Sequence, residues 1–138
     1  MKRKAVYTFF SLLMCITVCT TIAFAAEVQS SNQIKSCGTS LAKSSDGKLN
    51  ILLTISATEK MDVLGASSVL IQRYDGANWH TEYTVTPQNT PEIQVNGKSF
   101  HTLLITYSQN MPQSTYRAVV NFYARGSLGV SVATRIAQ

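Results

Sequence analysis

The feature that most constrains this chain is the strict alternation of side chains across residues 114–125. Every second position is apolar or aromatic, namely Tyr116, Ala118, Val120, Phe122 and Ala124. The positions between them are mixed in character, and no Gly or Pro interrupts the run. Successive side chains of a strand point to opposite faces, so this period of two predicts a strand with one buried face. We expect it to be a central strand of a β-sandwich.

A second stretch, residues 49–58, alternates in the same way. One face carries the apolar side chains Leu49, Ile51, Leu53, Ile55 and Ala57. Burying a Leu or Ile side chain stabilises a fold by roughly 1.5–3 kcal/mol, so we expect this face to line the core. The following residues, 58–66, suit a crossing between two sheets, with Met61, Val63 and Leu64 packed over the end of the core.

Weaker patterns predict five further strands. They cover residues 34–42, 67–74, 79–86, 99–107 and 128–136. The first should lie at a sheet edge and bend at Gly38, because glycine weakens the interior of a strand. In residues 103–105 apolar side chains occupy both faces, which indicates a central strand or a bulge.

Alternation also assigns the side chains that should face inward. Val69 and Ile71 form one predicted core pair. Trp79, Tyr83 and Val85 share one face of the next strand, and we expect Trp79 in the core. The apolar residues of the last strand are predicted to face inward, and they are Leu128, Val130, Val132 and Ile136.

Turn signals separate these strands. Residues 44–47 and 75–78 each contain Asp-Gly, which supplies the positive φ that hairpins need. The segment 86–98 is rich in Pro, Asn and Gly, and we expect a loop there with a short edge piece at 92–95. No helical period appears after residue 26. Six or seven short strands at this spacing predict an all-β, antiparallel, two-sheet sandwich.

The amino-terminal segment has the pattern of a secretory signal peptide. Lys2, Arg3 and Lys4 precede a long apolar run, and Ala23-Phe-Ala25 fits the small residues that signal peptidase requires. We therefore predict a signal peptide over residues 1–25 and a single domain over residues 26–138. An uncleaved anchor is the alternative, because roughly twenty apolar residues can span a bilayer. Either reading predicts a secreted or cell-surface protein, and the mature chain has no second apolar span.

Removal of the leader changes the charge of the chain. The whole sequence has 12 Lys and Arg against 7 Asp and Glu, and three of the positive residues lie in the leader. Nine positive residues then remain against seven negative ones, scattered without runs. Nucleic-acid binding needs a clustered basic surface, so we expect no nucleic-acid partner.

Removal of the leader also changes the number of cysteines. Cys15 and Cys19 lie in the leader, so Cys37 stands alone in the mature chain and no disulfide can form within it. The interpretation we favour is a small apolar side chain on a strand. An intermolecular disulfide or a reactive thiol is the alternative, because the compartment outside the cell is oxidising.

Tyr116-x-Ala118 at the start of the long strand resembles the tyrosine corner of immunoglobulin-like sandwiches. In that family a Tyr stands two residues before a core Cys, and its hydroxyl bonds to the backbone just upstream. The resemblance implies an immunoglobulin-like arrangement in which Ala118 takes the place of the Cys. The sequence departs from the family because its mature chain has no Cys pair and because Trp79 lies later in the chain than the usual strand C tryptophan.

The chain is also similar to small secreted bacterial proteins of unknown function. The similarity rests on a leader, a single early Cys, a Met-Asp-x-x-Gly-Ala segment, a Trp after a turn, and a Tyr-Arg-Ala strand. Here these are Cys37, residues 61–66, Trp79 and residues 116–118. The resemblance implies fold and export, and it carries no catalytic residue with it.

No pattern in the sequence indicates a known chemistry. His80 and His101 lack zinc-ligand spacing with Cys37, and no Gly-x-Ser-x-Gly elbow or Gly-rich phosphate loop is present. A Cys37–His pair lacks any surrounding signature. We therefore assign no catalytic, cofactor-binding or metal-binding residue, and we expect no cofactor.

The remaining candidates are aromatic residues that could form a binding face, since Tyr and Trp dominate recognition surfaces. They are Tyr74, Trp79, Tyr83, Tyr107 and Tyr123. Packing against the sheets is the interpretation we favour for them. The sequence as a whole predicts a monomeric, non-catalytic protein for recognition or adhesion, with a protein or glycan partner at the cell surface. The alternatives are a secreted antibacterial or inhibitor protein and a small hydrolase of unfamiliar type.

Overall fold

The structure, a computed structural model, describes residues 33–109 and 111–138. These residues belong to one compact unit, Ser31–Gln138. The predicted signal peptide lies outside the described residues. Within the described part of the chain, no helix has the length and apolar character needed to cross a membrane.

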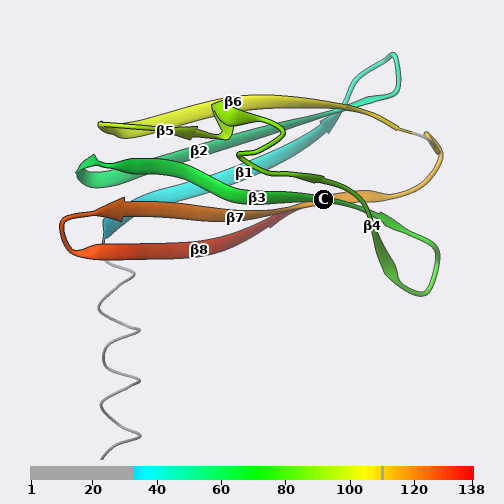
Figure 1. Ribbon diagram of the computed structural model, residues 1–138. Helices are drawn as coiled ribbons and strands as arrows, with labels where there is room; N and C mark the ends of the chain where they lie inside the picture. The colour runs from blue at the N-terminus through cyan, green and yellow to red at the C-terminus, as the bar shows by residue number, and fades with distance from the viewer. Residues whose placement is uncertain (1–32, 110) are drawn as a thin grey trace, which may run out of the picture. The chain divides into compact units, whose positions relative to one another are not determined.

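The described residues form two antiparallel sheets that pack face to face, as Figure 1 shows. The strands are β1 (Ile34–Lys43), β2 (Lys48–Met61), β3 (Val63–Tyr74), β4 (Trp79–Val85), β5 (Gln94–Val95), β6 (Lys98–Ser108), β7 (Tyr116–Gly126) and β8 (Gly129–Ala137). One sheet has the order β1-β2-β6, and the other has the order β4-β3-β7-β8 with β5 paired to β3. The predicted all-β, two-sheet architecture is confirmed.

The two strands with the clearest alternation supply the opposite walls of the core. On β7 the residues predicted to be buried are buried, and Phe122 is the largest of those that are fully buried. On β2 the predicted face from Leu49 to Ala57 is buried as well. β7 lies between β3 and β8, so it is the central strand that its sequence predicted. Val69 and Ile71 on β3 complete this part of the core.

The chain crosses from one sheet to the other at Asp62, between β2 and β3. Met61 and Leu64 on either side of the crossing are buried, as predicted. Just beyond, Gly65 lies so close to the next segment that a Cβ there would be 2.1 Å from the carbonyl oxygen of Ile93. Ile93 belongs to a short 3-10 helix, η2 (Pro91–Ile93), that precedes β5. Its side chain is fully buried, which the sequence did not predict.

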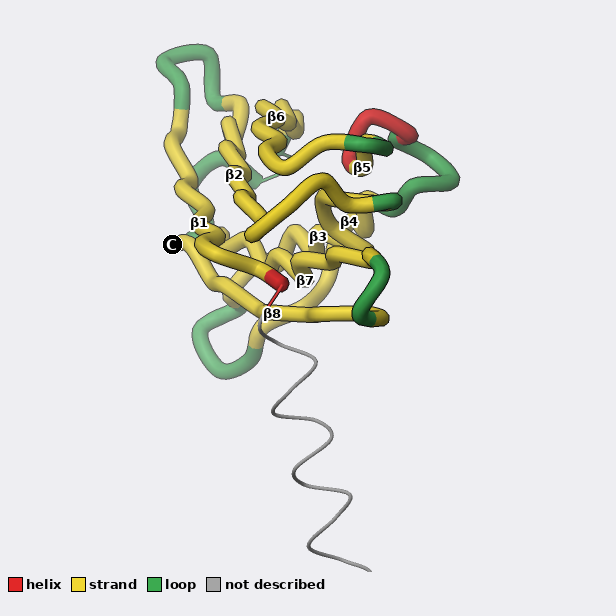
Figure 2. The backbone as a smooth tube through the Cα atoms, turned by 90° about the vertical axis from the view of Figure 1, so that its left-hand side faces the viewer, coloured by secondary structure: helices red, strands yellow, loops and turns green. Residues whose placement is uncertain are grey.

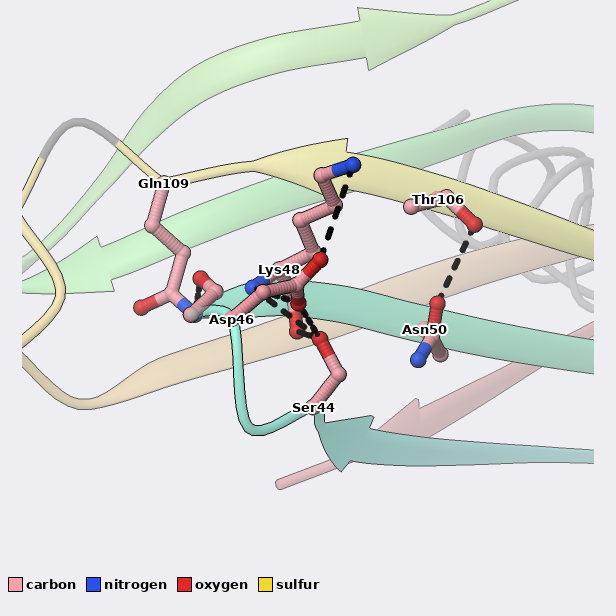
Figure 3. Close-up of polar contacts among 7 residues, drawn as sticks. Ser44, Asp46, Lys48, Asn50, Thr106 and Gln109 are labelled. Atoms are coloured by element: carbon pink, nitrogen blue, oxygen red, sulfur yellow. Dashed lines mark hydrogen bonds and ion pairs between the residues drawn. The ribbon is translucent and has the colours of Figure 1, made fainter.

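The predicted turns are also present. At residues 44–47 the backbone N–H of Lys48 donates to the Ser44 hydroxyl at 3.2 Å and to Asp46 Oδ1 at 3.3 Å. Figure 3 shows these contacts together with Gln109, which donates from the end of β6 to the carbonyl of Gly47. The Ser44 hydroxyl and the Lys48 N–H hold the pKa of Asp46 below its usual value. The Gln109 bond therefore ties this turn to the chain just after β6.

The predicted orientation of the last strand is wrong. The four apolar residues expected inside are exposed, at 79% for Leu128, 41% for Val130, 63% for Val132 and 56% for Ile136. β8 instead turns small side chains inward, including Ser131 and Ala137. Here β1 lies across β8, and Figure 2 shows β1 beside the carboxyl end of the chain.

Small inward residues on β8 are required because a buried glutamine occupies this space. Gln33 is 2% exposed, and its Nε2 donates to the Gly129 carbonyl at 2.9 Å and to the Ser131 hydroxyl at 3.1 Å. A Val or Leu at Ser131 would displace this amide. The larger apolar side chains of β8 therefore point away from the core.

The predicted faces of three other strands need correction. A bulge between Thr81 and Tyr83 breaks the alternation of β4, so Trp79 falls on the opposite face from Tyr83 and Val85. Val85 is buried, and Tyr83 is 44% exposed. Trp79 is half-buried and lies outside the core cluster. The strand around residues 103–105 is neither central nor bulged, because β6 is an edge strand with regular pairing there. On β1 the irregularity falls between residues 34 and 36 instead of at Gly38.

Candidate binding surface

Tyr74 and Trp79 are brought together by the hairpin that joins β3 to β4. They face each other in the register of the two strands, and their ring centroids are 5.1 Å apart at an angle of 41°. Both lie on the outer face of the sheet, on the same side as Gln72. Tyr74 is exposed and Trp79 is half-buried, so one aromatic surface is open to solvent.

The hairpin turn holds these two rings in place. Asp75 Oδ1 accepts hydrogen bonds from the backbone N–H groups of Ala77 at 2.8 Å and Asn78 at 2.7 Å, while Oδ2 bonds to the His80 ring. The two backbone N–H groups, together with His80, hold the pKa of Asp75 well below its usual range. The Tyr74 hydroxyl donates to the Gly76 carbonyl at 3.1 Å.

Arg117 on β7 completes the surface. Its guanidinium carbon lies 4.3 Å from the centroid of the Trp79 ring, in cation–π geometry. Its Nε donates to Gln72 Oε1 at 2.7 Å, and Gln72 Nε2 donates to the Thr81 hydroxyl at 3.0 Å. Among the described residues, the two Nη groups of Arg117 have no hydrogen-bond partner. We call Gln72, Tyr74, Trp79, Thr81 and Arg117 the aromatic–arginine cluster.

This cluster combines three properties of a recognition surface. Its side chains come from three paired strands, so the backbone beneath them is rigid. Its aromatic groups offer contact area at low entropic cost, as Tyr and Trp do at the centres of interfaces. The guanidinium of Arg117 is oriented through Nε and by stacking, which leaves its outer edge as a planar fork for a carboxylate or a hydroxyl pair.

The other predicted aromatics lie elsewhere. Tyr83 on β4 and Tyr107 on β6 stack with ring centroids 5.8 Å apart, and the Tyr107 hydroxyl donates to Glu82 at 3.4 Å. Glu82 also accepts from Arg73 Nε at 2.6 Å, and both of these side chains are half-buried. Burial, followed by the charge of Glu82, raises the pKa of Tyr107. These four side chains therefore contact one another within the molecule.

Two further tyrosines are set apart from the cluster. Tyr123 lies toward the far end of β7, opposite Gly65. Tyr116 is buried at the start of β7, and its hydroxyl accepts a hydrogen bond from the backbone N–H of Met111 at 3.3 Å. Burial also raises the pKa of Tyr116. Of the five predicted aromatic candidates, the structure therefore unites only Tyr74 and Trp79 in the cluster.

The residues considered for metal binding or nucleophilic chemistry stay apart. Cys37 and His101 pair with Ile55 from opposite sides, so two strand spacings, about 9.6 Å, separate their backbones. His101 bonds to the carbonyl of Glu92 at 2.9 Å, and His80 belongs to the other sheet. No group of three potential metal ligands occurs among residues 33–109 and 111–138. Cys37 is half-buried and packs against the core, in agreement with the favoured interpretation.

Arg117 and Gln72 were missed by sequence reasoning. Both occupy mixed faces of their strands, and nothing local distinguishes Arg117 from Arg125 eight residues later. The distinguishing fact is the register, which places Gln72 opposite Arg117 and Tyr74 opposite Trp79. Comparisons with protein-family models, with curated proteins and with solved structures find no match for this chain.

Proposed function

We propose that this protein is an exported, non-catalytic recognition or adhesion domain that binds a protein or glycan at the cell surface. The observation that carries the proposal is the aromatic–arginine cluster, in which Trp79 and Arg117 meet on a rigid outer sheet face. Such a surface provides contact area and one oriented cation. It provides no nucleophile with an adjacent base, which is what covalent catalysis needs.

The strand order supports an immunoglobulin-like arrangement for this domain. In such sandwiches strands A, B and E form one sheet, and strands C′, C, F and G form the other. The orders β1-β2-β6 and β4-β3-β7-β8 correspond to these sequences of strands. The hydrogen bond between Met111 and the Tyr116 hydroxyl fits the tyrosine corner of strand F. Immunoglobulin-like sandwiches are widely used as recognition modules outside cells.

A binding assay with surface variants tests the proposed function. Labelled protein should bind saturably to whole cells, or to isolated wall glycan or surface protein. Trp79→Ala and Arg117→Ala should each weaken that binding about tenfold or more, the loss typical of a central contact. Arg117→Lys should also weaken it, because lysine keeps the charge and loses the planar fork.

Tyr123→Ala is the matched control, since Tyr123 lies on the same outer face but outside the cluster. It should bind as the wild type does, and all four variants should melt within a few degrees of it. Binding that survives both Trp79→Ala and Arg117→Ala would assign recognition to another surface. Turnover of a substrate in place of stable binding would contradict the non-catalytic proposal.

A further inference from the structure

Besides the two-residue β5, the two sheets have four edge strands, and three of them carry features that hinder pairing with another chain. β1 has Lys35 and Lys43 and an irregular register near its start. β4 is short, with the charged Glu82 at a bulge. On β8 the buried Gln33 amide bonds to the carbonyl of Gly129, the first residue of the strand, and Arg135 adds a charge. Charges, bulges, short length and covering groups are the devices that protect natural sheet edges.

The fourth edge strand, β6, has such features only at its start, where Lys98 lies and the register against β2 shifts before Phe100. No Asp, Glu, Lys or Arg occurs between residues 99 and 116, and β6 itself contains no Pro. Its register against β2 is regular from Phe100 to Ser108. Within the described residues, β6 pairs with β2 alone.

The open part of this edge is the second half of the strand. Near its start, η2 reaches β6 through the bond between His101 and the Glu92 carbonyl. From Thr102 onward the strand is held in shape from the β2 side, since the Thr106 hydroxyl donates to Asn50 Oδ1 at 3.1 Å (Figure 3). Leu104 is 60% exposed on the outer face, and Leu103 and Ile105 are only partly buried on the inner face. Apolar side chains on both faces of this edge therefore remain partly exposed to solvent.

The sequence of this open segment reads nearly the same in both directions. It is Thr102-Leu103-Leu104-Ile105-Thr106, flanked by the aromatic rings of His101 and Tyr107. A two-fold axis through Leu104 would place Thr opposite Thr, Leu opposite Ile, and Leu104 opposite its own copy. Like-paired threonines and apolar residues are favourable neighbours across an antiparallel pair. A symmetric interface requires this self-complementarity, which a strand built for an unrelated partner does not need.

We propose that this protein forms a homodimer in which β6 pairs antiparallel with β6 of a second copy across a two-fold axis at Leu104. The product is one continuous sheet of six strands, three from each copy. It differs from the monomer expected from the sequence, because the sequence does not show that β6 is at an edge. The aromatic–arginine cluster lies on the other sheet, so this inference is independent of the proposed function.

Sedimentation analysis of the purified protein tests the pairing. The wild type should have twice the mass of one chain at micromolar concentrations. Leu104→Lys should have the mass of a single chain, because two lysines would then meet at the axis, and like charges directly opposite are destabilising. A mixture of Leu104→Lys with Leu104→Glu should regain the doubled mass.

Leu52→Lys is the matched control. Leu52 is the neighbour of Leu104 on β2, it is 43% exposed on the same outer face, and it has no free edge. This variant should remain a dimer, and both lysine variants should melt close to the wild type. A wild type with the mass of one chain at every concentration would overturn the proposal, as would a dimer that persists in Leu104→Lys.

Cross-linking gives an independent check on the geometry. In a Cys37→Ser background, Leu104→Cys should form a covalent dimer on oxidation, since opposed residues have Cα atoms about 4.5–5.5 Å apart, within disulfide range. Leu52→Cys in the same background should stay uncross-linked. Cross-linking of Leu52→Cys with none of Leu104→Cys would overturn the assignment to β6.

Discussion

Single side chains decide whether the rings of Tyr74 and Trp79 meet at all. The turn between them depends on Asp75, whose carboxylate accepts two backbone hydrogen bonds and contacts His80. The sequence predicted a hairpin at Asp-Gly, and the turn is confirmed. It also predicted Trp79 in the core, which is wrong, because the bulge near Glu82 reverses the alternation that the prediction assumed.

The charge of Asp75 should make part of the stability depend on pH. Its folded-state pKa lies below the unfolded value, so its contribution is present above about pH 4 and is lost as the pH falls further. Wild type should therefore exceed Asp75→Asn in unfolding midpoint at neutral pH, and the gap should shrink below about pH 4. Urea unfolding over a pH series measures this gap. A gap that stays constant or widens in acid would contradict the assignment.

At the scale of elements, burial on one face made β2 and β7 predictable, while the predictions for β1, β4, β6 and β8 needed correction. β2 and β7 are central strands, and each has a continuous apolar face against the core. Edge strands carry weaker constraints. On β8 the apolar residues point outward because Gln33 and β1 occupy the inner side, and this requirement comes from a segment about a hundred residues away.

The close approach of Gly65 on β3 to Ile93 of η2 gives a prediction at this scale. Gly65→Ala should destabilise the fold by at least about 1–3 kcal/mol, because the added methyl would overlap the Ile93 carbonyl. Gly38→Ala is the comparison, since a Cβ there meets no atom within 4 Å and alanine restricts the unfolded chain. Urea unfolding followed by circular dichroism measures both. Equal effects of the two substitutions would show that the contact at Gly65 is relieved at little cost.

At the scale of the whole molecule, the sandwich separates its candidate surfaces. The aromatic–arginine cluster lies on the outer face of the five-stranded sheet, and the free edge of β6 belongs to the three-stranded sheet. Dimerisation through β6 would leave the cluster of each copy open. Two binding surfaces on one particle would raise the overall avidity for a repetitive cell surface without any new contact.

Export is a prediction about the whole chain as well. In a bacterial host the exported protein should lack residues 1–25 and begin at Ala26 or Glu27, as shown by intact mass and amino-terminal sequencing. Ala25→Arg should retain the leader, because the peptidase requires a small residue there. Retention of residues 1–25 in the wild type would favour the membrane anchor instead.

The sequence alone determined the class of fold, the buried faces of β2 and β7 and most of the turns, because each depends on local alternation or on turn residues such as Asp-Gly. Tertiary structure decided which strands lie at edges, which way β8 faces, and that Arg117 meets Trp79. The physical reason is that strand pairing is a long-range choice. Register brings together residues that are far apart in the chain, and an open backbone edge exists only once all other strands have found their partners.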